Sequence, residues 1–167
     1  AGGEEPQDMA LALRSIADGS IDMQPDVTLR LFAGDGVEGF GPQQIVFSSP
    51  TTINLSGTGG LDLSAPGEIV GDFTINGASG NIMVRSGAGL ETTGTITSTG
   101  NISLETQDDL NIRHTISTTG TLNLEGSNIT QEAGGILTVG DLKVSAFSDV
   151  LLTQGAGNIG TLAKQLA

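Results

Sequence analysis

The sequence predicts an all-β fold, a parallel β-helix (β-solenoid) in which each coil of about twenty residues contributes three short strands. Three observations predict this fold. A Gly-x-(Ile/Leu)-x-(Val/Leu) pattern returns every twenty residues, two further aliphatic columns keep nearly the same period, and apolar and polar residues alternate within each strand. One coil cannot bury its own apolar face, so we expect the coils to stack into a common core.

The first strand of each coil follows a glycine. Its clearest copies cover residues 59–163, and an extra residue separates the first copy from the second. The copies are Gly59-Gly60-Leu61-Asp62-Leu63, Gly80-Asn81-Ile82-Met83-Val84, Gly100-Asn101-Ile102-Ser103-Leu104, Gly120-Thr121-Leu122-Asn123-Leu124, Gly140-Asp141-Leu142-Lys143-Val144 and Gly160-Thr161-Leu162.

The second and third strands are predicted from two further aliphatic columns. Turn-forming Gly, Asn, Asp and Ser separate them. The second column holds Ile69, Leu90, Leu110 and Val150, with Ile129 one place out of step, and the third holds Ile75, Ile96, Ile116 and Ile136. With strands about 4.8 Å apart, some six coils would form a rod on the order of 30 Å long.

The chain before the regular repeats divides at about residue 38. We expect residues 1–38 to form a cap or linker, with a short amphipathic helix at about 6–18, and residues 39–167 to form the solenoid, regular from about 59. The helix either covers the open end of the solenoid or docks on a partner or neighbouring module. Residues 27–31 alternate as a strand does, and Ile53 and Leu55 are expected twenty residues before Phe73 and Ile75.

Composition excludes several classes of function. A formal net charge of −13, from six basic and nineteen acidic residues, argues against nucleic acid as a partner. There is no Cys for a disulfide, no apolar run long enough to span a bilayer, and no signal peptide at the start. Because the chain opens Ala-Gly-Gly-Glu-Glu, we expect it to be a piece of a longer protein whose export signal lies elsewhere.

The glycine and aliphatic repeat resembles the repeats of filamentous haemagglutinin-like exoproteins of the two-partner secretion type, over residues 59–163 and more weakly over 39–58. The resemblance implies a right-handed β-helical rod, exported across the outer membrane, that serves as an adhesin or stalk. The Asn-Pro-Asn signature of that family's secretion domain does not occur in this sequence. The resemblance therefore predicts that this chain is part of the rod and not the secretion-targeting domain.

The sequence predicts no catalytic, cofactor-binding or metal site. His114 falls in a turn column. The acids available for catalysis are Asp108, Asp109, Glu91, Glu105 and Glu125, and of these Glu105 and Glu125, with Arg85 one coil before Glu105, fit a solvated and partly compensated charge ladder. Arg113 and Lys143 are too scattered for a substrate groove. The fragments Gly59-Gly60-Leu61-Asp62 and Gly34-Asp35-Gly36 are isolated and incomplete as calcium motifs.

A threonine array is the one surface pattern of note. Residues 95–99 and 115–119 imitate an ice-binding face over two coils, but the next copies read Gly135 and Leu137, so ordinary outward threonines are the expected explanation.

We therefore expect a non-enzymatic stalk or adhesive segment of a large secreted or surface-displayed bacterial protein. Its partners would be host or neighbouring-cell glycans or surface proteins, and the neighbouring repeats of a longer chain. The alternative is a scaffold that self-associates through its solenoid ends into filaments. A weaker alternative, a carbohydrate-active enzyme fragment, would require turnover that is lost when Asp108 and Asp109 become Asn.

Overall fold

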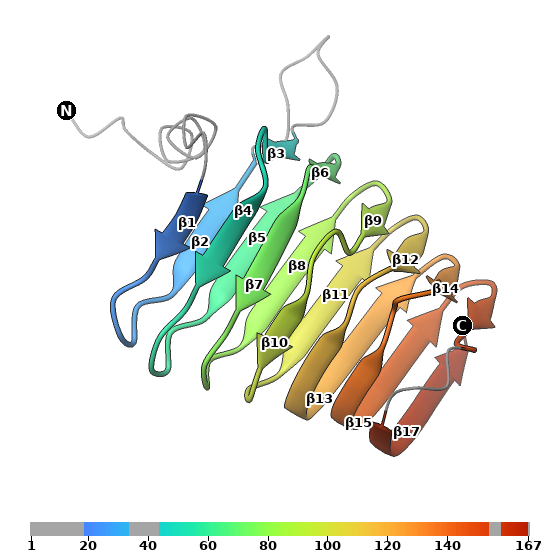
Figure 1. Cartoon of the computed structure of the whole chain (residues 1–167). Helices are drawn as coiled ribbons and strands as arrows, with labels where there is room; N and C mark the ends of the chain where they lie inside the picture. The colour runs from blue at the N-terminus through green and yellow to red at the C-terminus, as the bar shows by residue number, and fades with distance from the viewer. Residues whose placement is uncertain (1–18, 34–43, 154–157, 167) are drawn as a thin grey trace, which may run out of the picture.

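The computed structural model describes residues 19–33, 44–153 and 158–166, with side chains except at 19, 158 and 161–166 (Figure 1). Within these ranges the regular structure consists of β-strands, and all the pairings between them are parallel. The strands stack as a β-solenoid of about five turns. The predicted fold class is confirmed, whereas the helix expected at 6–18 lies outside the described residues.

Each coil has three sides, as the repeat predicted. The first face contains β1 (Gly19–Asp22), β4 (Thr51–Asn54), β7 (Phe73–Asn76) and β10 (Ile96–Ser98). The second face contains β2 (Leu29–Phe32), β5 (Leu61–Ala65), β8 (Ile82–Ser86) and β11 (Ile102–Thr106). The third face contains β3 (Ile45–Val46), β6 (Ile69–Val70), β9 (Leu90–Glu91), β12 (Leu110–Ile112), β14 (Ile129–Gln131) and β16 (Val150–Leu151).

Three long strands join the first and second faces. They are β13 (Ile116–Gly126), β15 (Leu137–Ala146) and β17 (Asn158–Leu166), and each continues through the corner where the earlier coils have a turn. The N-terminal part of β13 pairs with β10 on the first face and its C-terminal part pairs with β11 on the second. The two faces are therefore one continuous sheet bent at this corner.

The core consists mainly of aliphatic columns that point inward from the faces, together with the buried rings of Phe47 and Phe73. On the second face Ile82, Ile102 and Leu122 lie in register at twenty-residue spacing, and none is more than 1% exposed. Burying one such side chain stabilises the fold by about 1.5–3 kcal/mol. The columns therefore bind each coil to the next.

Polar side chains also point inward, beside the corners of the coils. Ser86, Ser98, Thr106 and Thr118 are buried, and their hydroxyls donate hydrogen bonds to backbone carbonyls at the corners. Ser98 Oγ, for example, donates to the Gly80 carbonyl at 2.9 Å. Because a buried hydroxyl without a partner is costly, these bonds allow the corners to turn inside the core.

The glycine that opens each repeat is required by close approach between coils. A Cβ at Gly80 would lie 2.1 Å from the Gly59 carbonyl oxygen, and a Cβ at Gly100 would lie 2.5 Å from the Gly80 oxygen. Neither glycine has a positive φ, so the absent side chain, and not backbone freedom, explains the motif.

Two predicted registers are wrong. Leu137, and not Ile136, pairs with Ile116 and is buried at 2% exposure, because this coil contains one additional residue between the two strands. Ile53 pairs with Ile75, twenty-two residues away, so the expected twenty-residue match of Ile53 with Phe73 is also wrong. By contrast, Ile129 does occupy the second aliphatic column although it is out of step in sequence.

Parallel pairing also includes strands that precede residue 39. The strands β1 and β2 pair with β4 and β5, so both belong to the same ladders as the regular coils. Within the described chain these two strands are the first members of the first and second faces.

The third face is interrupted between β6 and β9. The strands β3 and β6 form one two-stranded sheet, and β9, β12, β14 and β16 form another. Near the gap the Phe73 N–H donates to Thr93 Oγ1 at 3.0 Å, and that hydroxyl donates to the Gly71 carbonyl at 3.0 Å. A side chain thus replaces part of the missing backbone ladder.

Candidate functional site

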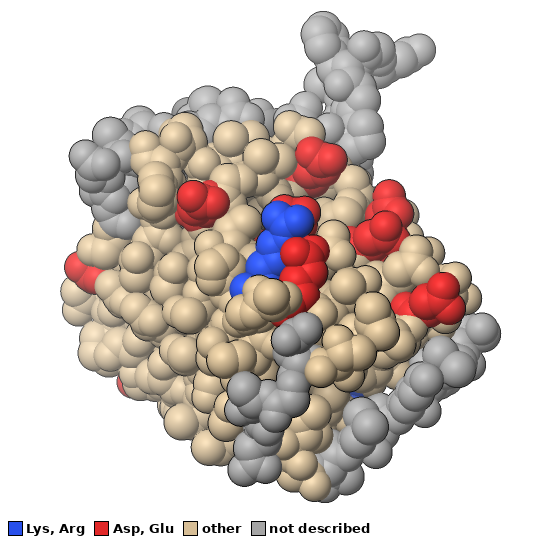
Figure 2. Space-filling model, turned by 45° about the vertical axis from the view of Figure 1, so that its right-hand side comes forward, with Lys and Arg blue, Asp and Glu red and all other residues tan. Residues whose placement is uncertain are grey.

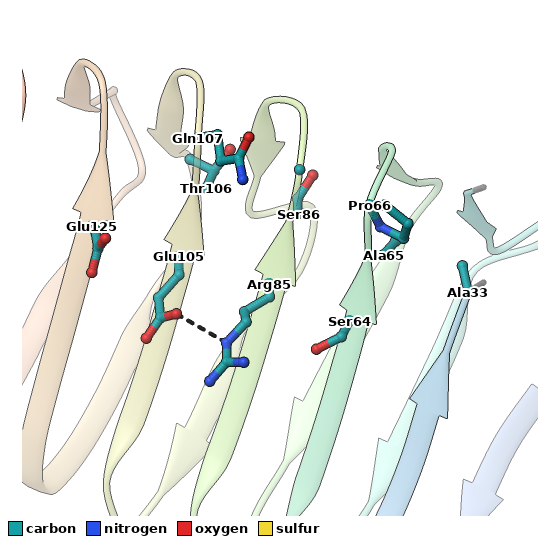
Figure 3. A pocket seen from close by; sticks show the side chains of 11 residues that line it. Ala33, Ser64, Ala65, Pro66, Arg85, Ser86, Glu105, Thr106, Gln107 and Glu125 are labelled. Carbon is teal, nitrogen blue, oxygen red and sulfur yellow. Dashed lines mark hydrogen bonds and ion pairs between the residues drawn. The ribbon is translucent and has the colours of Figure 1, made fainter. Parts of the chain in front are cut away.

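The second face carries a charge ladder of Arg85, Glu105 and Glu125, which lie on β8, β11 and β13 in consecutive coils. Arg85 Nε donates to Glu105 Oε2 at 3.0 Å, and Ser103 Oγ donates to the other oxygen of that carboxylate at 3.0 Å. Figure 3 shows Arg85 and Glu105 pointing toward each other and Glu125 on the neighbouring strand. The ladder predicted from sequence is therefore present.

The charges of this ladder do not balance. Glu125 is a direct neighbour of Glu105, and among the described residues it has no ion pair with a basic side chain. Like charges directly opposite on adjacent strands destabilise a sheet. The ladder therefore has an uncompensated carboxylate at its Glu125 end.

An open groove of about 580 Å³ runs beside the charge ladder. Figure 3 shows its lining, which is mostly small or polar and comes from β5, β8, β11 and β13, from the corners that follow them, and from Ala33 directly after β2. It contains one basic side chain, Arg85, and no aromatic ring. Such a surface supports shallow polar contacts.

Arg113 forms a second charged cluster on the third face. Its Nη1 lies 3.2 Å from Glu91 Oε2 and its Nε lies 3.1 Å from Glu132 Oε2, so one guanidinium bridges two carboxylates, one from the preceding coil and one from the following coil. Figure 2 shows one place on this side of the molecule where basic and acidic side chains meet, with other acidic groups scattered around it. Exposed pairs of this kind contribute only about 0.2–1 kcal/mol each, so the cluster serves chiefly to offset acidic repulsion.

The acids considered for catalysis lie at exposed corners. Asp108 and Asp109 sit between β11 and β12, and Asp109 Oδ1 accepts a hydrogen bond from Asn128 Nδ2 at 2.7 Å. Together with Glu68 and Glu91 they line a second groove of about 440 Å³, beside the gap between β6 and β9. The sequence alone does not associate Glu68 with these acids, because the gap that brings it near them depends on the pairing of the coils.

The remaining predicted residues are dispersed. His114 is exposed at a corner, and its backbone N–H donates to Thr92 Oγ1. Lys143 is exposed on β15 in register with Asn123, and Asp62 on β5 accepts a hydrogen bond from Ser64 Oγ at 3.2 Å. The segment Gly34-Asp35-Gly36 lies outside the described residues. Over the parts of the chain that the structure describes, no group of three or more His, Cys, Asp or Glu side chains could hold a metal ion.

The corner that contains Asp26 is held by a carboxylate. Asp26 Oδ1 accepts the Thr58 backbone N–H at 2.8 Å and its hydroxyl at 2.9 Å. These two bonds, the backbone bond first, lower the pKa of Asp26 below its ordinary 3.8. Asp26 itself has a φ of 66°, a conformation that aspartate tolerates better than most residues.

The first face presents two columns of short polar side chains, which we call the first-face polar array. One column runs along β1, β4, β7, β10, β13 and β15 as Asp22, Asn54, Asn76, Thr97, Ser117 and Thr138. The other contains Ser20, Thr52 and Thr74, and continues with Thr95 and Thr115 directly before β10 and β13. The sequence pattern indicated only the two central coils, because a strict twenty-residue period places Leu137 where Thr138 lies and Ile75 where Thr74 lies.

The fold and these surfaces define a β-solenoid repeat protein whose outward columns are its candidate contact sites. No protein-family model, curated protein or solved structure matches the chain. No helix within the described ranges is both long enough and apolar enough to cross a membrane.

Proposed function

We propose that this chain is a rigid spacer segment of a large secreted or surface-displayed bacterial adhesin-like protein, of the filamentous haemagglutinin-like type. The observation that carries the proposal is the unbroken ladder of the second face, from β2 through β5, β8, β11, β13 and β15 to β17. Because each coil contacts chiefly its neighbours, such a stack gains length in proportion to the number of coils. That property suits a stalk.

The outward columns would supply adhesion as well as reach. Each outward position repeats once per coil, so a weak contact made by one coil can be repeated by the next, which raises the avidity for an extended partner. The second-face groove and its charge ladder are polar and shallow, which favours glycans or surface proteins of a host or neighbouring cell over a buried small molecule.

The experiment is an immunoblot of the native polypeptide in its source cells, with and without protease added to intact cells. A band far larger than the 16.8 kDa of this chain, lost on protease treatment, supports a surface-exposed rod. A band near 16.8 kDa that is protected from protease would refute the secreted stalk.

A self-assembling scaffold is the second candidate, and the end strands favour it. Among the described strands β1 and β2 each pair on one side only, as does β17. Open edges of this kind can pair with another chain. Polymers whose size grows with protein concentration in light scattering would favour the scaffold, and a strict monomer at high concentration would count against it.

A further inference from the structure

We propose that the first-face polar array binds ice. Its two columns extend over consecutive coils from β1 to β15, strands that Figure 1 shows side by side. This contact would be a property of the surface itself, separate from the spacer role proposed above.

The chemistry of the array fits an uncharged, hydrogen-bonding surface. From β4 to β15 both columns consist of hydroxyl or amide side chains, apart from Ile136 at the end of one column, although the whole chain carries a net charge of −13. The one carboxylate, Asp22, lies at the β1 edge and accepts a hydrogen bond from Asn54 Nδ2 at 2.7 Å. Ionised groups hold their own hydration shells, so a neutral face in an acidic protein is suited to a neutral partner.

The spacing of the array is fixed in two directions. Along each column the side chains repeat at the strand separation of about 4.8 Å, and the columns stand two residues apart along a strand, or about 6.6–6.8 Å. These distances are close to the two repeats of oxygen atoms on a prism face of ice. A peptide or a single sugar has no such two-dimensional repeat and could use only a few of these groups.

A polysaccharide surface is a poorer match. Extended arrays of sugar rings are often bound by aromatic faces, and neither column of the first-face polar array contains an aromatic residue. Phe47 and Phe73 are buried, while Phe32 and Phe147 lie outside both columns. The array therefore offers hydroxyls and amides in a lattice without a stacking platform.

The side chains of the array are held in place before any contact. Asn76 Nδ2 donates to Asn54 Oδ1 at 2.8 Å, which extends the bond from Asn54 to Asp22 along the column. The threonines are β-branched and stiff at χ1. Beneath them Ile75, Ile96 and Ile116 are fully buried. A rigid surface loses little entropy on binding, which favours adsorption to a crystal.

The experiment measures thermal hysteresis and the shape of single ice crystals in solutions of the 167-residue chain, with an unrelated globular protein as the baseline. The double variant Thr97→Lys/Ser117→Lys places two charges at the centre of the array. The matched control, Asn111→Lys/Thr130→Lys, places the same charges on adjacent coils of the third face, at equally half-buried positions. Circular dichroism melts verify that all three chains are folded.

Hysteresis and faceted crystals are expected for the wild-type chain and the control, with loss to the baseline for the first-face variant. Baseline behaviour of the wild-type chain overturns the proposal, whether or not the chain adsorbs to insoluble chitin or cellulose. Equal loss in both variants, or full activity in the first-face variant, overturns it as well. The wild-type result decides the question even where a variant fails to fold.

Discussion

Replacement of Gly100 by alanine should destabilise the solenoid, because the coils meet at this residue with no space for a side chain. The added Cβ would lie 2.5 Å from the Gly80 carbonyl oxygen and 2.6 Å from the Ser79 oxygen, both backbone atoms that cannot rotate away. Overpacking of this kind costs about 1–3 kcal/mol. At roughly 2–4 °C per kcal/mol for a chain of this size, the midpoint of thermal unfolding should fall by roughly 2–12 °C.

Gly89→Ala is the matched control for this prediction. A Cβ there meets nothing closer than the Asp109 carbonyl oxygen at 3.5 Å, an ordinary contact. The control should be neutral, or more stable by about 0.4–1 kcal/mol, because alanine restricts the unfolded chain.

The assay for both variants is far-ultraviolet circular dichroism with heat and with urea, since the chain lacks Trp and Tyr as fluorescent probes. Agreement between the two transitions tests whether a single unfolding free energy applies to this repeat array. If Gly100→Ala unfolds at the same temperature as Gly89→Ala, close approach of the coils does not explain the glycine of the repeat.

Three further predictions test the core, the charge ladder and an acidic corner. Leu104→Ala removes a side chain that is 1% exposed and should cost about 2–5 kcal/mol in a urea titration; a cost under about 1 kcal/mol would contradict the described packing. Glu125→Lys places a cation beside Glu105 and should stabilise the fold by about 0.2–1 kcal/mol at low salt, with the gain shrinking in high salt; an unchanged or lower melting temperature at low salt would argue against repulsion there. Asp26→Asn removes a carboxylate whose pKa is lowered by Thr58, so the stability that this carboxylate adds is complete above pH 3.8 and is lost as the pH falls through the folded pKa. The wild type should therefore exceed Asp26→Asn in melting temperature near neutral pH and approach it on acidification below pH 3.8, and a difference that does not change with pH would refute the linkage.

The coil and its three columns could be predicted from the sequence because the inward positions are almost entirely aliphatic. Period-two alternation around Ile102 and Leu104 assigned their faces correctly, since a shift of one residue would expose both. The same alternation indicates that Thr106 points inward. We did not predict this, because a hydroxyl in the core is stable only with the carbonyl partner that the corner supplies.

The register of the less regular coils could not be read from the period. One additional residue between Ile116 and Leu137 shifts the register of β15 by one position. The aliphatic pattern of the sequence does not reveal this shift, because Ile136 is as aliphatic as Leu137. The C-terminal extent of the first-face polar array, at Thr138, depended on this one residue. The gap between β6 and β9 likewise could not be predicted, because it depends on how two neighbouring coils pack together and not on the sequence of either coil alone.

The coils differ in length, yet their strands stay paired. The paired strands maintain the framework, and the connections between them accommodate the differences in length. Leu29 and Leu61 remain in register across thirty-two residues, whereas Ile82 and Ile102 do so across twenty. Coils of unequal length therefore keep the same ladder. Each corner is then an independent place on the surface where new sequence can be accommodated at little cost to folding, which would let such a protein vary what it displays while its framework stays the same.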